Sequence, residues 1–208
     1  MSRKSYRIKL CWGVESGECR NLVHTDTNLY QDLESILENS GWPECLERNL
    51  TREIKPLDQF SISVSGCPNG CSRPQIADFG LLYALYPQVK KSVCTGCGEC
   101  VRACREGAID LEGGKAGINP EYCLSCGKCV EACPENALCP AALGYRVQIG
   151  GKLGRHPRLA DELLGIKSRQ DVLRILANCL QMHQECYLPG IRFGQVVSEH
   201  GLESINSR

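Results

Sequence analysis

The chain has 208 residues, which suits one compact domain or two small ones with a buried core. Its 24 basic and 24 acidic residues cancel, so charge gives no support for binding nucleic acid or an anionic membrane. No apolar run of transmembrane length is present, and no apolar segment follows the basic residues of the start. We therefore expect a cytoplasmic protein without membrane insertion or a signal peptide.

Predicted strands and helices alternate through the first part of the chain. Residues 6–10 alternate apolar and basic side chains, residues 28–38 place apolar side chains at helical spacing, and Pro43 opens a second short helix. Strand signals return at 60–64, and the short apolar run at 79–85 predicts a buried strand. Near the end, 145–149 predict a strand, 172–180 an amphipathic helix, and 193–200 a short element.

The middle of the chain has a different character. Residues 93–138 show little periodicity, contain eight cysteines, and carry seven acidic against four basic residues. The same cysteine pattern occurs at 94–104 and at 123–133, with a period of 29 residues. We therefore predict an α+β body, residues 1–86 and 144–208, that is interrupted by a small two-cluster ferredoxin-like repeat at 87–143.

Cysteine occupies 16 of the 208 positions, an unusually high share. Disulfide scaffolds are usually secreted and shorter than about 80 residues, whereas intervals of two and three residues are typical of metal sites. Each of the two runs matches the bacterial-type ferredoxin pattern, in which the fourth cysteine ligates the other cluster. The predicted ligand sets are Cys94, Cys97, Cys100 and Cys133 for one cluster, and Cys123, Cys126, Cys129 and Cys104 for the other.

This doubled pattern resembles the two-cluster bacterial-type ferredoxins, which implies two [4Fe-4S] clusters and electron transfer. Zinc is the alternative metal, because thiolates select zinc as well as iron–sulfur clusters. In the first run, Arg105 stands where proline usually follows the fourth cysteine. We interpret this as a local departure that affects a potential or a partner contact and leaves the ligands intact.

A second group of motifs surrounds the middle segment. The turn at 65–72 reads SGCPNGCS, Cys11 and Cys19 precede it, and the segments 77–81 and 144–157 follow it. Together they resemble the iron–sulfur and siroheme half of the nitrite/sulfite reductase family, over residues 7 to about 200. The fold class expected is therefore half of such a sheet-and-helix domain, interrupted by the ferredoxin repeat.

The resemblance implies a third [4Fe-4S] cluster, held by Cys11, Cys19, Cys67 and Cys71. It also implies that Cys71 shares its thiolate with siroheme iron. In the same way, the basic loop Lys152, Arg155, His156 and Arg158 would face the siroheme carboxylates or an anionic substrate. A solvated loop or a partner contact is an equally open interpretation of this loop.

Two departures from the family pattern bear on these expectations. Cys11 and Cys19 are separated by seven residues, a longer interval than is usual in the family, so Cys45 remains an alternative to either of them. Family enzymes also carry a whole module before the first cysteine pair, whereas ten residues precede Cys11 here. On this ground the sequence favours an electron-transfer role over a catalytic one.

Three functions follow from the sequence. The first is an iron–sulfur redox protein with three [4Fe-4S] clusters in an anaerobic oxidoreductase system, with no catalytic residue assigned. The alternative is a minimal siroheme-dependent sulfite or nitrite reductase, or its catalytic subunit. The third is an interaction scaffold in which clusters only stabilise the fold. Expected partners are redox proteins, subunits of an oxidoreductase complex or a second copy of the chain; nucleic acid is not expected.

Overall fold

The computed structural model describes residues 4–206 and contains a five-stranded and a two-stranded sheet. The strand order of the larger sheet is β1-β2-β3-β6-β7; β1, β2 and β3 run parallel, and β6 and β7 are antiparallel to their neighbours. Its strands are β1 (Tyr6–Leu10), β2 (Phe60–Ser65), β3 (Phe79–Val89), β6 (Leu138–Ile149) and β7 (Asp161–Glu162). The smaller sheet pairs β4 (Ile109–Glu112) with β5 (Lys115–Ile118).

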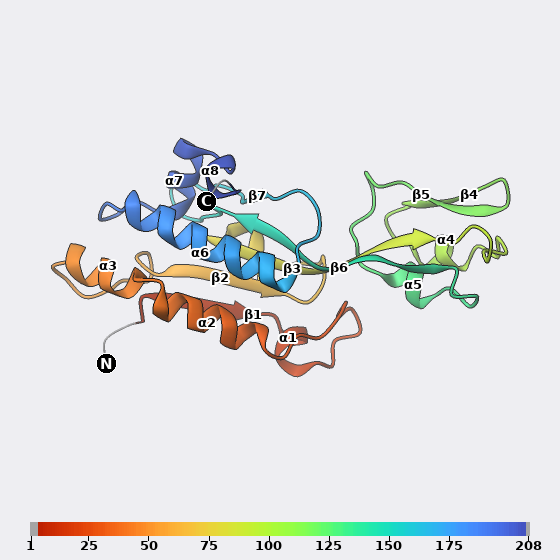
Figure 1. Cartoon of the computed structure of the whole chain (residues 1–208), viewed down its shortest axis with the longest axis horizontal. Coiled ribbons are helices and arrows are strands. Elements are labelled where there is room, and N and C mark those ends of the chain that lie inside the picture. Colours follow the sequence, from red (N-terminus) through yellow and green to blue (C-terminus); the bar gives the residue numbers. More distant parts are fainter. Residues whose placement is uncertain (1–3, 207–208) are drawn as a thin grey trace.

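Helices α2 (Leu29–Asn39) and α6 (Arg169–Glu185) pack together against the larger sheet, and an apolar core fills the space between the helices and the sheet (Figure 1). The fully buried Trp42 donates its indole N–H to the Ser5 carbonyl at 2.9 Å and so joins α3 (Trp42–Asn49) to the start of β1. The helices are α1 (Trp12–Ser16), α2 (Leu29–Asn39), α3 (Trp42–Asn49), α4 (Glu99–Ala103), α5 (Lys128–Glu131), α6 (Arg169–Glu185), α7 (Phe193–His200) and α8 (Glu203–Asn206), with a 3₁₀ turn η1 (Pro74–Ile76).

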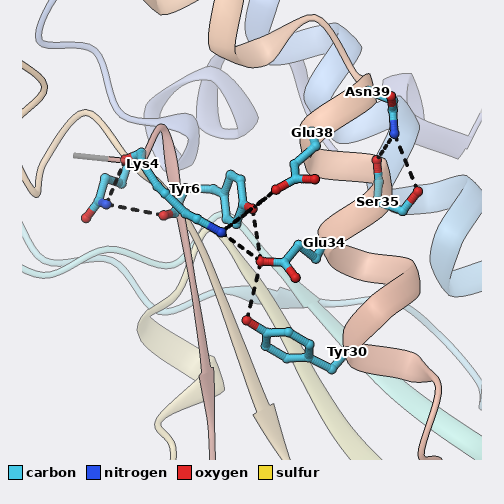
Figure 2. Close-up of polar contacts among 8 residues, drawn as sticks. Lys4, Tyr6, Tyr30, Glu34, Ser35, Glu38 and Asn39 are labelled. Atoms are coloured by element: carbon cyan, nitrogen blue, oxygen red, sulfur yellow. Dashed lines mark hydrogen bonds and ion pairs between the residues drawn. The ribbon is translucent and has the colours of Figure 1, made fainter. Parts of the chain in front are cut away.

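Polar contacts at the amino end of β1 fix this strand against α2 (Figure 2). The Tyr6 hydroxyl donates to Glu38 Oε1 at 2.7 Å, and Lys4 Nζ lies 2.9 Å from Glu34 Oε1. Burial of the ring, helped by the bond to Glu38, raises the pKa of Tyr6 to about 12. These contacts therefore hold β1, which Cys11 directly follows, against α2.

The predicted α+β fold is confirmed, but two strands are longer than the sequence suggested. β3 and β6 pair from Phe79 and Ile149 at the sheet to Val89 and Leu138. The predicted boundaries at 87 and 143 therefore fall inside these strands. Apolar runs reveal buried strands, whereas the outer half of this two-stranded ribbon is partly exposed and gives no such signal.

Residues 90–137, hereafter the cysteine segment, connect these two strands. Figure 1 shows the segment beyond the end of the larger sheet, with α5 on the side near the sheet and β4 at the far end. The segment has a separate, small core made of a few apolar side chains and cysteines: Ile109, Ala116, Ala137, Leu138, Cys94, Cys100 and Cys129. The hairpin β4–β5 was not expected, and neither were the short helices α4 and α5, because one turn of helix carries no measurable period.

Candidate iron–sulfur centre

The ends of two neighbouring parallel strands bring together the cysteines of the reductase-like motifs. Cys11 directly follows β1 and Cys67 lies two residues beyond β2. Cys11, Cys19, Cys67 and Cys71, hereafter the turn set, line one cavity of about 90 Å³. Within residues 4–206, no three His, Cys, Asp or Glu side chains converge as they would around one metal ion. A four-iron cluster is a larger body than an ion, so the cavity between the sulfurs is the relevant feature.

A one-turn helix accounts for the long interval between Cys11 and Cys19. α1 begins directly after Cys11 and is capped at its carboxyl end by Gly17, which has a left-handed φ of 73°. Gly13 in α1 faces both cysteines: a Cβ on it would lie 2.6 Å from Cys19 Cβ and 3.9 Å from Cys11 Sγ. Only glycine allows this close approach. The longer loop therefore contains a helix that keeps Cys11 and Cys19 together.

Serines on the second face of β2 hold the loop that carries Cys67 and Cys71. Phe60, Ile62 and Val64 enter the apolar core, and the alternate side chains are buried on the opposite face. Ser63 Oγ donates to the Ser72 carbonyl at 2.8 Å, and Ser65 Oγ shares a 2.6 Å hydrogen bond with Ser72 Oγ. Sequence reasoning missed this role, although the Ser-x-Ser-x-Ser alternation was its visible signal.

The two cysteines of the turn differ in exposure. Cys67 is buried, and this burial, with the nearby sulfurs of the turn set, raises the pKa of its thiol. Cys71 is exposed. Cys11 Sγ accepts a hydrogen bond from the Gly66 N–H at 3.3 Å. The alternative residue, Cys45, lies on α3 within the apolar core and does not line this cavity.

The cysteine segment brings its eight cysteines together in two further groups. Cys94, Cys97, Cys100 and Cys133, hereafter the outer set, line one cavity. In the second group, hereafter the inner set, Cys104 joins Cys123, Cys126 and Cys129. Burial raises the pKa values of Cys123 and Cys129, and negative charge on the neighbouring cysteines, Cys104 included, raises both further. Burial raises the pKa of Cys129 to about 12.

The two runs share a backbone conformation position by position. Gly96 and Ser125 both have left-handed φ values, 75° and 58°, as do Gly98 and Gly127 at 79° and 73°. The fourth cysteine of each run accepts a hydrogen bond from the fourth residue after it: Ala108 N–H to Cys104 Sγ at 3.4 Å, and Ala137 N–H to Cys133 Sγ at 3.2 Å. The sequence repeat is therefore also a structural repeat.

The same repeat closes on itself through two equivalent backbone hydrogen bonds. Lys90 N–H donates to the Ala137 carbonyl at 2.7 Å, and Asn119 N–H donates to the Ala108 carbonyl at 2.8 Å. Each bond joins the start of one run to the end of the other. This exchange places the fourth cysteine of each run beside the first three of its partner.

The donor chemistry of all three sets fits [4Fe-4S] clusters. Each set offers four cysteine sulfurs, the soft ligands that such clusters take. Each set also contains a sulfur that accepts a backbone N–H, and hydrogen bonds of this kind tune cluster potentials. In the outer set, the N–H groups of Ala116 and Gly96 hold the pKa of Cys94 below its usual value.

The inner set and the turn set meet at a larger cavity of about 400 Å³. Cys126 of the inner set and Cys67 of the turn set both line it, together with Asn69 and Arg105. Two contacts hold the inner run there: Leu85 N–H of β3 donates to the Ser125 carbonyl at 2.8 Å, and Lys128 Nζ donates to the Arg20 carbonyl at 2.7 Å.

The basic loop lies beside the segment that follows Cys71. Ala160 N–H donates to the Gln75 carbonyl at 2.8 Å, and a Cβ on Gly151 would lie 2.5 Å from the same oxygen. Arg158 forms an ion pair with Asp161 and donates to the Gly150 carbonyl at 2.8 Å, so its guanidinium stabilises the loop itself. Lys152, Arg155 and His156 form no ion pair within residues 4–206.

Three cysteines besides Cys45 belong to none of the three sets. Cys179 is fully buried on α6, and burial raises the pKa of its thiol. Cys139 lies on β6, and Cys186 Sγ lies 3.5 Å from His200 Nε2 near the end of the chain. None of the described helices is both long enough and apolar enough to span a membrane.

Comparison with known proteins identifies the family. The sequence profile of the nitrite and sulphite reductase 4Fe-4S domain matches residues 16–207. The chain belongs to this family. It is 45% identical over 120 residues to the coenzyme F420-dependent sulfite reductase of Methanocaldococcus jannaschii, covering 58% of this chain and 19% of that protein.

Two further likenesses agree with this membership. The chain is 33% identical over 75 residues to one subunit of the anaerobic sulfite reductase of Salmonella typhimurium, covering 34% of this chain and 22% of that protein. The crystal structure of dissimilatory sulfite reductase I superposes with a TM-score of 0.61 at 16% identity, covering 96% of this chain and 51% of that one. The matched regions thus span a fifth to a half of the length of these proteins, and the chain shares the fold of the last.

Proposed function

We propose that the protein is an electron-transfer component of a sulfite reductase system and that it carries three [4Fe-4S] clusters. The observation that supports this best is the cavity shared by Cys67 and Cys126, one cysteine from the turn set and one from the inner set. The inner set adjoins the outer set through the exchanged fourth cysteines, Cys104 and Cys133. The three sets therefore form a continuous series from the ends of β1 and β2 into the cysteine segment.

The chain's own residues would organise such a series for electron flow. The outer set would receive electrons, the inner set would pass them on, and the turn set would deliver them. The clusters supply one-electron chemistry when bound, and the backbone N–H groups at Cys11, Cys94, Cys104 and Cys133 would tune their potentials. Ligation by Cys11 and Cys19, instead of Cys45, is part of this proposal.

Iron analysis of anaerobically purified protein tests the proposal. We expect about twelve iron atoms per chain, since each [4Fe-4S] cluster contributes four. Cys67→Ala should lower the content by about four, whereas Cys139→Ala, at a half-buried cysteine outside the sets, should leave it unchanged. Electron paramagnetic resonance of reduced samples should show the loss of one of three interacting signals. Zinc in place of iron, or a content unaffected by Cys67→Ala, would refute the third cluster.

A second function is favoured by one specific observation, the exposure of Cys71. The basic loop contacts Gln75, four residues after Cys71. Siroheme linked through Cys71, with its carboxylates near Lys152 and Arg155, would make the chain a minimal sulfite or nitrite reductase or its catalytic subunit. Tetrapyrrole extracted after expression in a siroheme-producing host, with sulfite-dependent oxidation of a reduced dye, would support this alternative; a tetrapyrrole-free protein would exclude it.

Partner proteins are part of the proposal. One relative is by its name a subunit of anaerobic sulfite reductase, and another is a much longer F420-dependent enzyme. We infer that this chain also works beside other redox subunits, which would supply its electrons. The cytoplasm is the compartment that suits it, because thiolate ligands must stay reduced. Affinity purification under anaerobic conditions would identify such subunits.

A further inference from the structure

Two of the three sulfur sets meet at the cavity of about 400 Å³ that Cys67 and Cys126 share, hereafter the junction cavity. Its charged lining consists of two basic and two acidic side chains: Arg105, Lys128, Glu106 and Glu131. Lys128 and Glu131 form an ion pair with each other at 2.8 Å. Arg105 and Glu106 are exposed, and neither forms an ion pair within residues 4–206. Arg105 is therefore the cation that balances Glu106 at this cavity.

The repeat shows which of these two charges is particular to the junction. With the period of 29 residues, Glu106 corresponds to Glu135. Each of these glutamates lines the cavity beside its own set, Glu106 that of the inner set and Glu135 that of the outer set. Arg105 corresponds to Pro134, which carries no charge. Arg105 is therefore a charge that the first run has and the second run lacks at the equivalent position.

Basic side chains also lie beside the outer set, but they come from other positions of the cysteine segment. Lys91 Nζ donates to the Ala116 carbonyl at 2.7 Å, and Lys115 Nζ donates to the Cys94 carbonyl. Neither lysine lines the junction cavity, and Arg105 does not line the cavity of the outer set. The charge of Arg105 therefore acts mainly on the inner set and the turn set, and the outer set serves as an internal reference when Arg105 is changed.

We propose that Arg105 makes the inner and the turn-set clusters easier to reduce, and so favours the transferred electron on these two clusters. This inference rests on the proposed function and adds to it a residue that sets reduction potentials. Each electron that a cluster accepts adds one negative charge and changes no bond. A cation lining the cavity between the two sets stabilises the reduced state of each cluster more than its oxidised state, since local charge is one determinant of a cluster's potential.

Anaerobic redox titration of the holoprotein at low ionic strength, followed by electron paramagnetic resonance, tests this role. Arg105→Gln removes the charge and keeps a polar side chain, whereas Arg105→Lys keeps the charge. The matched control is Arg48→Gln, which makes the same charge change at an exposed arginine on α3 that forms no ion pair within the described residues. Chains with Cys67→Ala or Cys133→Ala assign the signals, because they should lack the turn-set cluster and the outer cluster, respectively.

In the Arg105→Gln chain we expect the potentials of the inner and turn-set clusters to fall. At a fixed solution potential, the ratio of reduced to oxidised cluster should drop roughly threefold, which corresponds to about 30 mV for one electron. The outer cluster should keep its potential, and so should all three clusters of the Arg48→Gln chain. Arg105→Lys should restore most of the loss. Because Arg105 is exposed, the difference between the native and Arg105→Gln chains should shrink as the ionic strength rises.

Three results would overturn the role of Arg105. Unchanged inner and turn-set potentials in the Arg105→Gln chain would leave Arg105 as a partner contact. An equal fall in the Arg48→Gln chain would show that only the net charge of the chain matters. An equal fall in the Arg105→Lys chain would show that packing of the cavity, and not its charge, sets the potentials.

The iron content of each sample separates this inference from the proposed function. A native chain without the turn-set cluster would refute the function itself. Full iron content in the native and Arg105→Gln chains, with the same potentials in both, would refute the role of Arg105 and leave the function standing.

Discussion

The two cysteine runs have nearly the same backbone structure in two different surroundings. They share left-handed backbone positions at Gly96 and Ser125, and the same N–H to sulfur hydrogen bond closes each run. The inner run, however, packs on β3, where a Cβ on Gly127 would lie 3.3 Å from Leu85. In the outer run, Cys97 is exposed. Internal symmetry thus builds two equivalent sites, and attachment to the sheet gives them different surroundings.

The largest test of the comparison concerns the exchanged fourth cysteines. Cys133→Ala should abolish the outer cluster, although Cys133 lies in the second run, and Cys104→Ala should abolish the inner one. Alkylation under anaerobic conditions followed by mass spectrometry would then label Cys94, Cys97 and Cys100 in the first variant. In the second variant it would label Cys123, Cys126 and Cys129. The opposite labelling would show that each run closes its own site.

Equivalent left-handed positions should respond very differently to substitution. In the outer run, a Cβ on Gly96 would lie 2.2 Å from the Gly114 carbonyl oxygen, which is backbone and cannot yield easily. We expect Gly96→Ser to lower the free energy of unfolding by roughly 3 kcal/mol. In the inner run Ser125 already has a φ of 58°, so Ser125→Gly should cost about 1 kcal/mol or less. Denaturant unfolding of the two holoproteins checks the contrast, and equal losses would contradict the difference in packing between the two positions.

The free energy of unfolding should depend on pH through a buried histidine that packs in the core of the larger sheet, outside the cysteine segment. His183 on α6 is buried against Trp42, with ring centroids 4.4 Å apart, and burial lowers its pKa to about 4. Between pH 6.5 and 4 the unfolded chain binds a proton that the folded chain does not, so stability falls as the pH falls. From pH 7 to pH 5 this difference amounts to about 2 kcal/mol.

Acid also weakens iron–sulfur clusters, so the measurement compares two chains. His183→Phe keeps an aromatic ring beside Trp42 and removes the titrating group. We expect the free energy of unfolding of this variant to change less between pH 7 and pH 5 than that of the native chain, by about 2 kcal/mol. Parallel pH profiles for the two chains would show that His183 contributes nothing to acid sensitivity.

The smallest expected effect concerns the residue that follows the glycine in each run. Lys128 of the inner run reaches the Arg20 carbonyl as well as Glu131, whereas Glu99 of the outer run pairs with its near neighbour Arg102. Lys128→Gln should lower stability by about 1 kcal/mol, since it removes a hydrogen bond between the inner run and the loop before α2. Glu99→Gln should change stability by less than about 0.5 kcal/mol, because the ion pair is exposed. Hydrogen exchange at Ser125 and neighbouring amides measures both.

Local sequence was sufficient wherever chemistry depends on spacing or period. The strands at 6–10 and 60–64 and the helices near 28–38 and 172–180 lie where their apolar periods indicate. The family resemblance, drawn from the turn around Cys67 and its flanking segments, is confirmed by the profile match. Helices as short as α1 and α4 were not predicted, because one turn of helix gives no measurable period.

The sequence by itself determined which residues have the chemistry of cluster ligands, because the intervals between cysteines are covalent and local. Tertiary structure alone decided which sulfurs meet. The ends of β1 and β2 place Cys11 beside Cys67, whereas Cys45 is buried in the apolar core. The inner run packs against the sheet, so Cys126 lies near Cys67 while its equivalent Cys97 is exposed. Cys67 and Cys126 are far apart along the chain, and no local pattern records a meeting of such distant residues.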